Sequence, residues 1–399
     1  MKSLSVWKNQ RRVGELAYGL NEYVFRYRKG AGPDDAISLT MPVQAGVYET
    51  QVLHPVFQQN LPEGMLADAL RRHFGKLIDL SDDIGLLRLT GKYNTGYLQV
   101  TEPDASPDSP PWGTLEDVLR HTNRASIEIF FDFIEKFGVA SGISGMQPKL
   151  IASLHQADNQ QLPRATIATG SCILKFHDDR EYFGLAVNEY FCLKAAEYAR
   201  LPAAKTYLDD AGEYLIVERF DKKPDGSYYC VEDFCVLQGL SRHGRYNGDY
   251  MDIINTVNGI VPPSQKGALI KQIYEAIAFS LKTGNGDAHL KNFALMYDQE
   301  NRTRLSPAYD LVCTSAYLNK ELPALGFLGE KAWPDEDKLL AFAGRCGITA
   351  EQALSIRARI DEGKQRAARE LGAYCKQHPK FRDVFSAMSD QWITGGNSV

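Results

Sequence analysis

Short apolar segments separated by polar turns open the chain, a pattern typical of β-strands. Residues 3–7 and 12–16 flank the polar turn at residues 8–10, which predicts a β-hairpin. Three aromatic residues occupy alternate positions of residues 23–27. Because successive side chains of a strand point to opposite faces, this spacing predicts a third strand with one aromatic face.

A helix is expected after these strands. Pro62 suits the first turn of a helix, and apolar residues recur through Met65, Ala69 and Phe74. We therefore expect a small α+β domain over residues 1–100. The stretch 101–113 is rich in proline and acidic residues, which predicts a linker between domains.

Strands and a helix alternate in the middle of the chain. The predicted strand 171–176 contains one charged residue, Lys175, and the predicted helix 187–199 carries Glu189 near its start. A buried, unpaired ammonium group is costly, so Lys175 needs a partner and Glu189 is the natural candidate. The alternative is a lysine whose ammonium group reaches solvent along the surface. A further apolar strand, 214–221, ends in charged residues.

The remaining chain has a mostly helical pattern. Ile273, Ile277 and Leu281 recur every fourth position, as one face of a helix should. Other segments with a clear pattern are predicted as a helix beginning at 232–234, a strand at 293–297, and helices at 339–343 and 356–371.

Two polar segments are expected at the surface. Residues 241–250 are polar and contain glycine, which predicts an exposed loop in which His243 lies at the surface rather than serving in catalysis. The tail from residue 393 is expected to fray.

Candidate chemistry follows the helix that contains Leu281. Gly284 and Gly286 break the helical pattern, which places Asp287 and Asn292 in a tight loop, five residues apart. Asp310 supplies a later carboxylate. Protein kinases use this arrangement, in which one Asp orients the attacking hydroxyl while an Asn and a second Asp hold magnesium. The alternative is that these residues only make a well-formed turn.

Two other stretches suit a nucleotide. Residues 140–149 combine two glycines with two serines before an apolar run, and glycines allow backbone N–H groups to turn toward a phosphate. The stretch is neither Gly-x-Gly-x-x-Gly nor a Walker A sequence, and a flexible hairpin is the alternative. Glu218 and Phe220, at the end of the strand 214–221, are candidates for the connector that contacts adenine in a two-lobed kinase.

Composition narrows the class of protein. The 399 residues exceed the size of one compact core, so two or three packed units are expected. A formal net charge of −5 argues against broad binding of nucleic acid by this chain alone. No apolar run is long enough for a membrane span, and no signal peptide is evident. The seven cysteines are scattered, which favours the cytoplasm, and Cys230 and Cys235 are expected to be packed thiols.

Taken together, these segments resemble the HipA family of bacterial serine/threonine kinases, the toxin halves of HipBA-type toxin–antitoxin pairs. The resemblance covers nearly the whole chain. The matching stretches, in family order, are Val6-Trp7, Val13-Gly14, Leu61-Pro-Glu-Gly64, Ser141-Gly-Ile-Ser-Gly-Met-Gln-Pro-Lys149, Ile173-Leu-Lys175, Asn188-Glu-Tyr190, Val217-Glu-Arg-Phe-Asp221, Asn285-Gly-Asp-Ala-His-Leu-Lys-Asn292 and Tyr309-Asp-Leu311.

The resemblance implies an α+β, protein-kinase-like, two-lobed fold, related to phosphoinositide kinases, behind a small N-terminal α+β domain. The lobes would span residues 114–221, with the glycine-rich loop, and 222–399, which is mostly helical. The implied roles are catalysis by Asp287 supported by His289 and Lys291, magnesium binding by Asn292 and Asp310, and ATP binding by Lys175, Glu189, Ser144, Gly145, Glu218 and Phe220.

The resemblance also implies regulation and partners. Family members phosphorylate a serine of their own glycine-rich loop, which expels the loop from the ATP site. Gly142 stands where some relatives have this serine, so Ser144 is the first candidate and Ser141 the second. The implied protein substrate is an aminoacyl-tRNA synthetase, and the implied partner is a helix-turn-helix antitoxin similar to HipB, through which the pair would bind DNA.

Two other functions remain open from the sequence. The first is a kinase of this fold with a different protein substrate and no toxin role. The second is a non-catalytic co-repressor that works with a helix-turn-helix protein. The presence of all five residues expected at an ATP site argues against the second; they are Lys175, Glu189, Asp287, Asn292 and Asp310.

Overall fold

The protein was analysed as a computed structural model. The structure describes residues 2–19, 22–62, 70–71, 83–94, 96–107, 164–168, 172–177, 182–298, 302–318 and 320–394. The chain divides into two compact units, described separately below. The first unit comprises Met1–Glu181 and Ile216–Glu232, and the second comprises Tyr182–Leu215 and Asp233–Val399.

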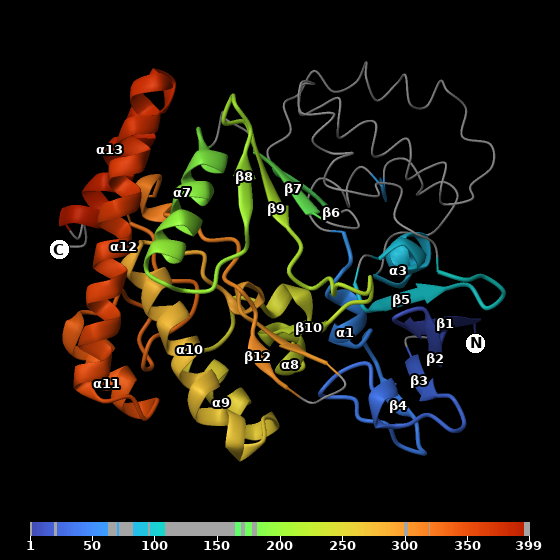
Figure 1. The fold of residues 1–399 in the computed structure, drawn as a ribbon. Coiled ribbons are helices and arrows are strands. Elements are labelled where there is room, and N and C mark those ends of the chain that lie inside the picture. The colour runs from blue at the N-terminus through green and yellow to red at the C-terminus, as the bar shows by residue number, and fades with distance from the viewer. Residues whose placement is uncertain are drawn as a thin grey trace, which may run out of the picture. The chain divides into compact units, whose positions relative to one another are not determined.

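An antiparallel sheet in the order β4-β3-β2-β1-β5 forms the base of the first unit (Figure 1). Its strands are β1 (Lys2–Lys8), β2 (Arg11–Gly19), β3 (Glu22–Tyr27), β4 (Tyr48–Thr50) and β5 (Leu98–Thr101). The predicted hairpin is confirmed, with Leu4 opposite Leu16. The predicted third strand is also confirmed, and its aromatic face buries Phe25 and Tyr27. Among the described residues of this unit, the helices α1 (Pro55–Gln58) and α3 (Asp83–Thr90) accompany the sheet.

A buried carboxylate joins distant segments of the first unit. Glu232, on β10 (Cys230–Asp233), has no exposed surface. Its two oxygens accept hydrogen bonds from Ser38 Oγ at 2.5 Å and from the Leu39 N–H at 2.8 Å. Because a buried carboxylate is tolerated only when hydrogen-bonded, these contacts fix the segment at residues 38–39 against β10.

A second sheet has the order β6-β7-β9-β8. Its strands are β6 (Arg164–Ala168), β7 (Cys172–His177), β8 (Thr206–Leu208) and β9 (Tyr214–Glu218). The predicted strand containing Lys175 is β7. The predicted strand 214–221 is β9, which ends earlier than expected, at Glu218. The boundary between the two units falls within β9, after Leu215.

Helices make up most of the second unit (Figure 1). They are α7 (Leu185–Tyr198), α8 (Phe234–Leu237), α9 (Tyr250–Ile260), α10 (Pro263–Lys282), α11 (Glu336–Arg345), α12 (Ala350–Gln377) and α13 (Arg382–Ser389). The predicted helices at 187–199, 273–281, 339–343 and 356–371 are therefore confirmed as parts of α7, α10, α11 and α12. The short strands β11 (Ala294–Tyr297) and β12 (Arg304–Leu305) pair antiparallel beside β10.

The core of the second unit lies around α10. The predicted apolar face is confirmed, since Ile273, Ile277 and Leu281 are all buried. Helices α7 and α12 approach each other closely at Gly363, where a β-carbon would lie 2.6 Å from the Ala195 carbonyl oxygen. The absence of a side chain at Gly363 therefore sets the spacing between these two helices.

The prediction of an exposed loop over residues 241–250 is wrong in two places. Arg242 and Gly244 are buried in a 3₁₀ turn, and the end of the stretch enters a helix. Tyr250 has no exposed surface and begins α9, where its ring contacts Phe293 and Phe327 edge to face. Asp249 caps this helix by accepting the Met251 N–H at 2.8 Å, which explains why the polar run ends in a helix. His243 is exposed, as predicted.

Other expectations have mixed outcomes. Cys230 and Cys235 are buried free thiols, as predicted. The predicted helix after Pro62 lies almost entirely outside the described residues, as does the linker beyond residue 107. In the tail, Asp390–Thr394 form a π-helical turn, and the residues after it are not described. None of the helices within the described ranges has both the length and the apolar character that crossing a bilayer requires.

Acid sensitivity is predicted for the first turn of α1. His54 caps this helix through Nδ1, which accepts the Val56 N–H at 3.3 Å, and burial lowers the pKa of His54 from 6.5 to about 4. Below pH 6.5 the unfolded chain binds a proton that the folded chain excludes. Stability should therefore fall between pH 6.5 and 4, by at most about 1.4 kcal/mol per pH unit from this residue.

His54→Asn keeps a capping acceptor without the titration, so its unfolding free energy should depend less steeply on pH. Urea unfolding at pH 7, 6 and 5 measures this slope. The exposed His243→Asn is the matched control and should follow the wild type. Equal slopes for His54→Asn and wild type would contradict the prediction.

Candidate active site

The loop predicted to carry the chemistry begins at the C-terminal end of α10. Thr283 Oγ1 donates to the carbonyl oxygens of Phe279 at 2.9 Å and Ser280 at 3.2 Å, inside the last turn. Gly284 then adopts a φ of +73°, in the left-handed region that ends many helices. Gln391 packs so closely that a β-carbon on Gly284 would lie 2.8 Å from its Cγ. The predicted glycine break is therefore confirmed at this position.

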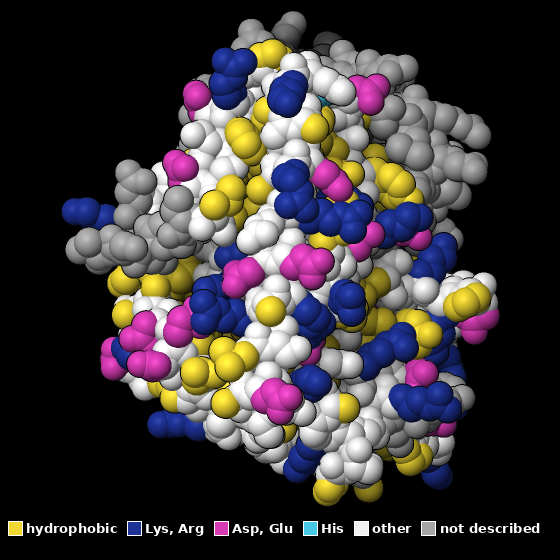
Figure 2. Space-filling model, turned by 60° about the vertical axis from the view of Figure 1, so that its left-hand side comes forward, with side chains coloured by type: hydrophobic (Ala, Val, Ile, Leu, Met, Phe, Trp, Pro, Cys, Tyr) yellow, Lys and Arg dark blue, Asp and Glu magenta, His cyan; other side chains and the backbone are white. Residues whose placement is uncertain are grey.

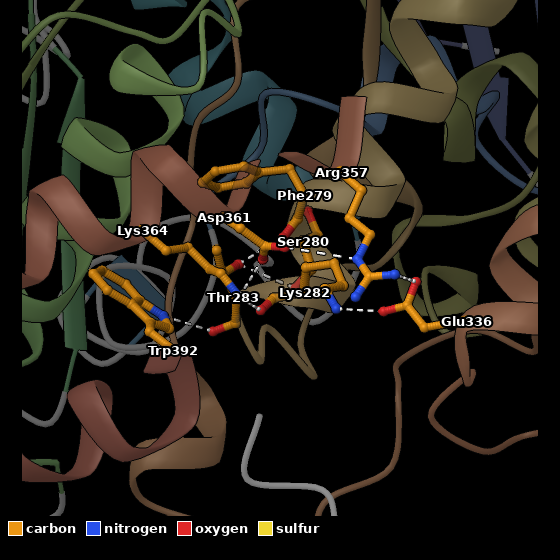
Figure 3. A network of polar contacts seen from close by, with 9 residues as sticks. All are labelled: Phe279, Ser280, Lys282, Thr283, Glu336, Arg357, Asp361, Lys364 and Trp392. Carbon is orange, nitrogen blue, oxygen red and sulfur yellow. Dashed lines mark hydrogen bonds and ion pairs between the residues drawn. The ribbon is translucent and has the colours of Figure 1, made fainter. Parts of the chain in front are cut away.

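Two buried donors from later in the chain satisfy carbonyl groups at this helix end (Figure 3). Lys364 Nζ, on α12, donates to the Lys282 carbonyl at 3.2 Å, and Trp392 Nε1 donates to the Thr283 carbonyl at 3.2 Å. The last carbonyls of a helix lack intrahelical partners and form the negative end of its dipole. The ammonium group of Lys364 therefore stabilises this end both as a donor and as a charge.

An ion-pair network extends from this helix end (Figure 3). Its members lie on α10, α11 and α12, and its pairs are Lys282–Glu336 at 2.7 Å, Arg357–Glu336 at 3.0 Å, Arg357–Asp361 at 3.7 Å and Lys364–Asp361 at 3.1 Å. Burial lowers the pKa of Lys364, and the carboxylate of Asp361 opposes that shift. The network therefore provides an ion-pair partner for a lysine that is largely excluded from water.

The glycine-containing loop is clamped by a segment that follows Asp310. The Gly286 N–H donates to Thr314 Oγ1 at 2.7 Å, and Thr314 Oγ1 donates to the Gly284 carbonyl at 3.2 Å. The N–H and hydroxyl groups of Ser315 donate to the same carbonyl at 3.1 and 3.0 Å. Both glycines are thus held through their backbone groups by Thr314 and Ser315.

Asn188, on α7, holds this clamp in place. Its Oδ1 accepts the Cys313 N–H at 2.8 Å and its Nδ2 donates to the Cys313 carbonyl at 3.1 Å. Asn188 has no exposed surface. A buried amide that pairs with both polar groups of one residue fixes the position of that residue along the chain. The contact therefore connects α7 to the segment that supports the loop.

Three of the predicted site residues meet in one chain of hydrogen bonds. The His289 N–H donates to Asn292 Oδ1 at 2.9 Å, and Asn292 Nδ2 donates to Asp310 Oδ2 at 2.8 Å. Lys291 contributes its carbonyl oxygen, which accepts the Tyr309 hydroxyl at 2.6 Å. The loop and the later carboxylate, eighteen positions apart, are therefore in direct contact.

Asp287 lies at the start of the same loop and is half-buried. Its N–H donates to Asn285 Oδ1 at 3.1 Å, which turns the chain after the buried Asn285. Its carboxylate oxygen Oδ1 accepts the hydroxyl of Tyr246 at 3.0 Å. Close by, burial raises the pKa of Glu321 and the negative charge of Asp287 adds to that shift.

His289 is buried beside these carboxylates. Burial lowers the pKa of His289, and the charges of Asp287 and Asp310 only partly oppose this. The imidazole is therefore neutral near pH 7. It packs edge to face against Tyr246, with ring centroids 5.1 Å apart.

Asp310 has a backbone conformation that few residues adopt. Its φ is +56°, in the left-handed region where Asn and Asp are the least disfavoured residues after glycine. Such conformations cost about 1–3 kcal/mol and cluster at functional sites. Here the conformation brings the carboxylate to within hydrogen-bonding distance of Asn292.

Asn292 and Asp310 fit a divalent cation that prefers oxygen ligands. The amide oxygen of Asn292 and the carboxylate of Asp310 are oxygens of the kind Mg²⁺ uses, and the two side chains touch through Asn292 Nδ2. The Asn292 oxygen accepts one hydrogen bond and keeps a second lone pair. The donor set is thus compatible with the predicted magnesium site.

The other predicted residues are placed separately. Lys175 lies on β7 in the first unit, and Glu189 lies fully buried on α7 in the second, so their pairing stays a prediction. Glu218 and Phe220 are both half-buried in the first unit. Ser141, Ser144 and Gly145 lie outside the described residues.

Sequence reasoning missed several contacts of this site. The missed residues are Tyr246, Thr314, Lys364 and Trp392. Tyr246 lay in a segment interpreted only as exposed loop, and its contact with Asp287 spans 41 positions. Neither Lys364 nor Trp392 stands out in the sequence, although a lysine within an apolar helix face is a signal that could have identified Lys364.

The fold and this site define the molecule as an α+β protein with a kinase-like fold. Comparison with a chain of the solved complex of HipA, HipB and operator DNA from Shewanella oneidensis gives a TM-score of 0.61 at 18% identity, covering 97% of this chain and 96% of that one. At this identity the likeness shows the fold alone.

The chain belongs to the HipA-like family. Residues 141–369 match the HipA-like C-terminal domain and residues 4–101 match the HipA N-terminal domain. Among relatives, Y4dM of Sinorhizobium fredii, a proposed kinase, is 26% identical and covers 84% of this chain and 82% of its own length. The serine/threonine-protein kinase toxin HipA of Shewanella oneidensis is 25% identical over 240 residues, covering 55% of this chain and 54% of its own length.

Gly286→Ala should destabilise the protein. A β-carbon at this position would lie 2.3 Å from Glu321 Oε2 and 2.4 Å from its Cδ, so the carboxylate or the loop must move. We expect a loss of about 1–3 kcal/mol in the free energy of unfolding, measured with urea. Gly259→Ala, on α9 with open space around it, is the control and should be neutral or slightly stabilising. Equal effects of the two substitutions would refute this prediction.

Lys364→Met should also destabilise the protein, because it leaves the carbonyl of Lys282 and the carboxylate of Asp361 without this donor. We expect a loss of about 1–3 kcal/mol. Lys266→Met is the matched control, since Lys266 Nζ also donates to a carbonyl, that of Asn258 at 2.6 Å, but at the surface. Its effect should stay within about 0.5 kcal/mol. If both variants unfold at the wild-type urea midpoint, Lys364 does not support the helix end.

Proposed function

We propose that this chain is an ATP- and Mg²⁺-dependent serine/threonine protein kinase that acts as the toxin of a toxin–antitoxin pair. The observation that carries the proposal is the loop after α10, in which Asp287 precedes Asn292 by five residues and Asn292 bonds to Asp310 at 2.8 Å. Phosphoryl transfer needs a carboxylate for the acceptor and oxygen ligands for a metal ion, and this loop supplies both kinds of group. The names of the relatives support the same activity.

In this proposal the residues of the loop have separate roles. Asp287 accepts the proton of the acceptor hydroxyl and orients its oxygen. Asn292 and Asp310 hold Mg²⁺, which when bound neutralises negative charge on the phosphates. His289 supports the loop in two ways. Its neutral ring packs against Tyr246, and its backbone N–H fixes the Asn292 amide. Lys291 supports the loop through the bond between its carbonyl and Tyr309.

In this proposal ATP is bound by the residues that the resemblance implies. Lys175 would bind the α- and β-phosphates and Glu189 would orient it, as in the kinase arrangement. Glu218 and Phe220 would contact adenine, and the loop with Ser144 and Gly145 would cover the phosphates. Phosphorylation of Ser144, or secondarily of Ser141, would add a charge of roughly −1.5 to −2, which would repel ATP from the site.

The proposed partners follow from the family and from the solved relative. That relative is a complex of HipA with HipB and operator DNA. We propose a helix-turn-helix antitoxin similar to HipB as the partner, with DNA bound through it, which suits the net charge of −5. The proposed substrate is an aminoacyl-tRNA synthetase, whose phosphorylation would stall translation in the cytoplasm.

The test is the intact mass of the purified protein after incubation with Mg-ATP. The wild type should gain one phosphate, mapped to Ser144 or Ser141. Asp287→Asn should lose the gain, because its amide cannot accept the proton, and the rate should drop at least about 100-fold. Asp383→Asn, an exposed carboxylate on α13, is the control and should behave as the wild type.

Other outcomes separate the alternatives. An absence of both phosphate gain and ATP binding would favour a non-catalytic co-repressor. Phosphate gain without growth arrest on expression would favour a kinase with a different role. Growth arrest on expression of the wild type that is absent on expression of Asp287→Asn would support the toxin function.

A further inference from the structure

One aromatic side chain makes an unexpected contact with the proposed catalytic carboxylate. Tyr246 lies between the turn at Arg242–Gly244 and α9, and 46% of its side chain is exposed. Its hydroxyl nevertheless donates to Asp287 Oδ1 at 3.0 Å. An exposed phenol is free to bond with water, so a direct bond to this one carboxylate requires an explanation.

Two neighbouring side chains lie against the ring of Tyr246. The rings of Tyr246 and His289 pack edge to face with centroids 5.1 Å apart, and the guanidinium of Arg245 lies 5.7 Å from the Tyr246 ring centroid. The backbone beside it is anchored, because the Leu290 N–H donates to the Arg245 carbonyl at 3.1 Å. Beyond the ring, Asn247 and Gly248 are exposed. The backbone is therefore fixed to the catalytic loop, while nearly half of the Tyr246 side chain is exposed to solvent.

The bond to Asp287 is the same bond that an acceptor must form. A kinase carboxylate orients the substrate by accepting a hydrogen bond from its hydroxyl group. In the structure, the Tyr246 hydroxyl makes this bond, so a serine or threonine hydroxyl that takes the same position on Asp287 Oδ1 must displace Tyr246.

We propose that Tyr246 is a gate that occupies the acceptor position of Asp287 until a substrate hydroxyl displaces it. This inference rests on the proposed kinase function and adds a control on acceptor entry to it. The resting gate occupies one acceptor position of the carboxylate, which limits the wasteful transfer of phosphate to a water molecule bound at that position. The acceptor must compete with the gate, so weakly bound acceptors are disfavoured.

Tyr246→Phe removes the hydroxyl and keeps the ring. The acceptor to use is a synthetic peptide with the sequence of residues 138–150, which contains Ser141 and Ser144. Removing a competing hydrogen bond to a partly exposed charged group changes the apparent affinity of the acceptor by about 3- to 10-fold. We expect the KM for the peptide to fall by this factor while kcat stays within about 2-fold of wild type. ATP hydrolysis without peptide should rise, because a water molecule can take the vacated place.

Tyr198→Phe is the matched control. The Tyr198 hydroxyl also donates to a carboxylate, that of Glu370 at 2.6 Å, but between α7 and α12. This variant should leave KM, kcat and ATP hydrolysis unchanged. Equal thermal unfolding midpoints of Tyr246→Phe and wild type show that the fold is intact.

The outcomes distinguish a gate from other roles. A lower kcat at unchanged KM in Tyr246→Phe would make Tyr246 a positioning residue for Asp287 and overturn the gate. Unchanged constants and unchanged hydrolysis in an active enzyme would also overturn it and leave the kinase proposal intact. A wild type that neither phosphorylates the peptide nor hydrolyses ATP, like Asp287→Asn, would remove both proposals. If the peptide is a poor acceptor but the wild type hydrolyses ATP, the hydrolysis rates test the gate instead. A faster rate in Tyr246→Phe supports the gate, and an unchanged rate contradicts it.

Discussion

The site depends on how α10 ends. A helix leaves its last carbonyl groups without intrahelical partners, and a helix that ends inside a core must find donors for them. Here Lys364 and Trp392 provide donors from α12 and from the turn after α13, while Thr283 bonds back into its own helix. With this end fixed, Gly284 can turn the chain sharply, and the loop that follows begins from a defined position. Figure 2 shows that charged groups of both signs intermix over one face of the molecule. Among the charged groups at this helix end, Lys364 differs from such surface charges because it is buried.

Two buried polar side chains, one in each unit, have the same structural role. Glu232 in the first unit and Asn188 in the second each accept or donate bonds to the backbone of a segment far away in the sequence. Neither has any exposed surface. An apolar residue of similar size would fill the same space, but it could not select one register of the partner segment. Their contribution is therefore to the uniqueness of the arrangement as well as to its stability.

Local patterns predicted the elements, and contacts between distant residues escaped them. The period of Ile273, Ile277 and Leu281 identified α10, and the spacing from Asp287 to Asn292 identified the loop, because both signals lie within one stretch of chain. The contact between Asn292 and Asp310 could be expected only from the order of the motifs. Tyr246 could not be found at all, since no pattern shows that a polar loop returns to a carboxylate 41 positions later. The misjudged end of that loop, at Tyr250, has the same origin, because a cap at Asp249 converts polar sequence into the start of a buried helix.

The supports of the helix end have a further consequence for the order of synthesis. Lys364 follows its partner carbonyl by 82 positions, and Trp392 follows its partner by 109. At about 5–20 residues per second, a ribosome needs roughly 5–20 seconds to make the chain between the loop and Trp392. During that interval the nascent chain contains Asp287 and its neighbours without the donors that hold them. The loop therefore reaches its final structure only late in translation, so a growing chain does not yet contain the assembled site.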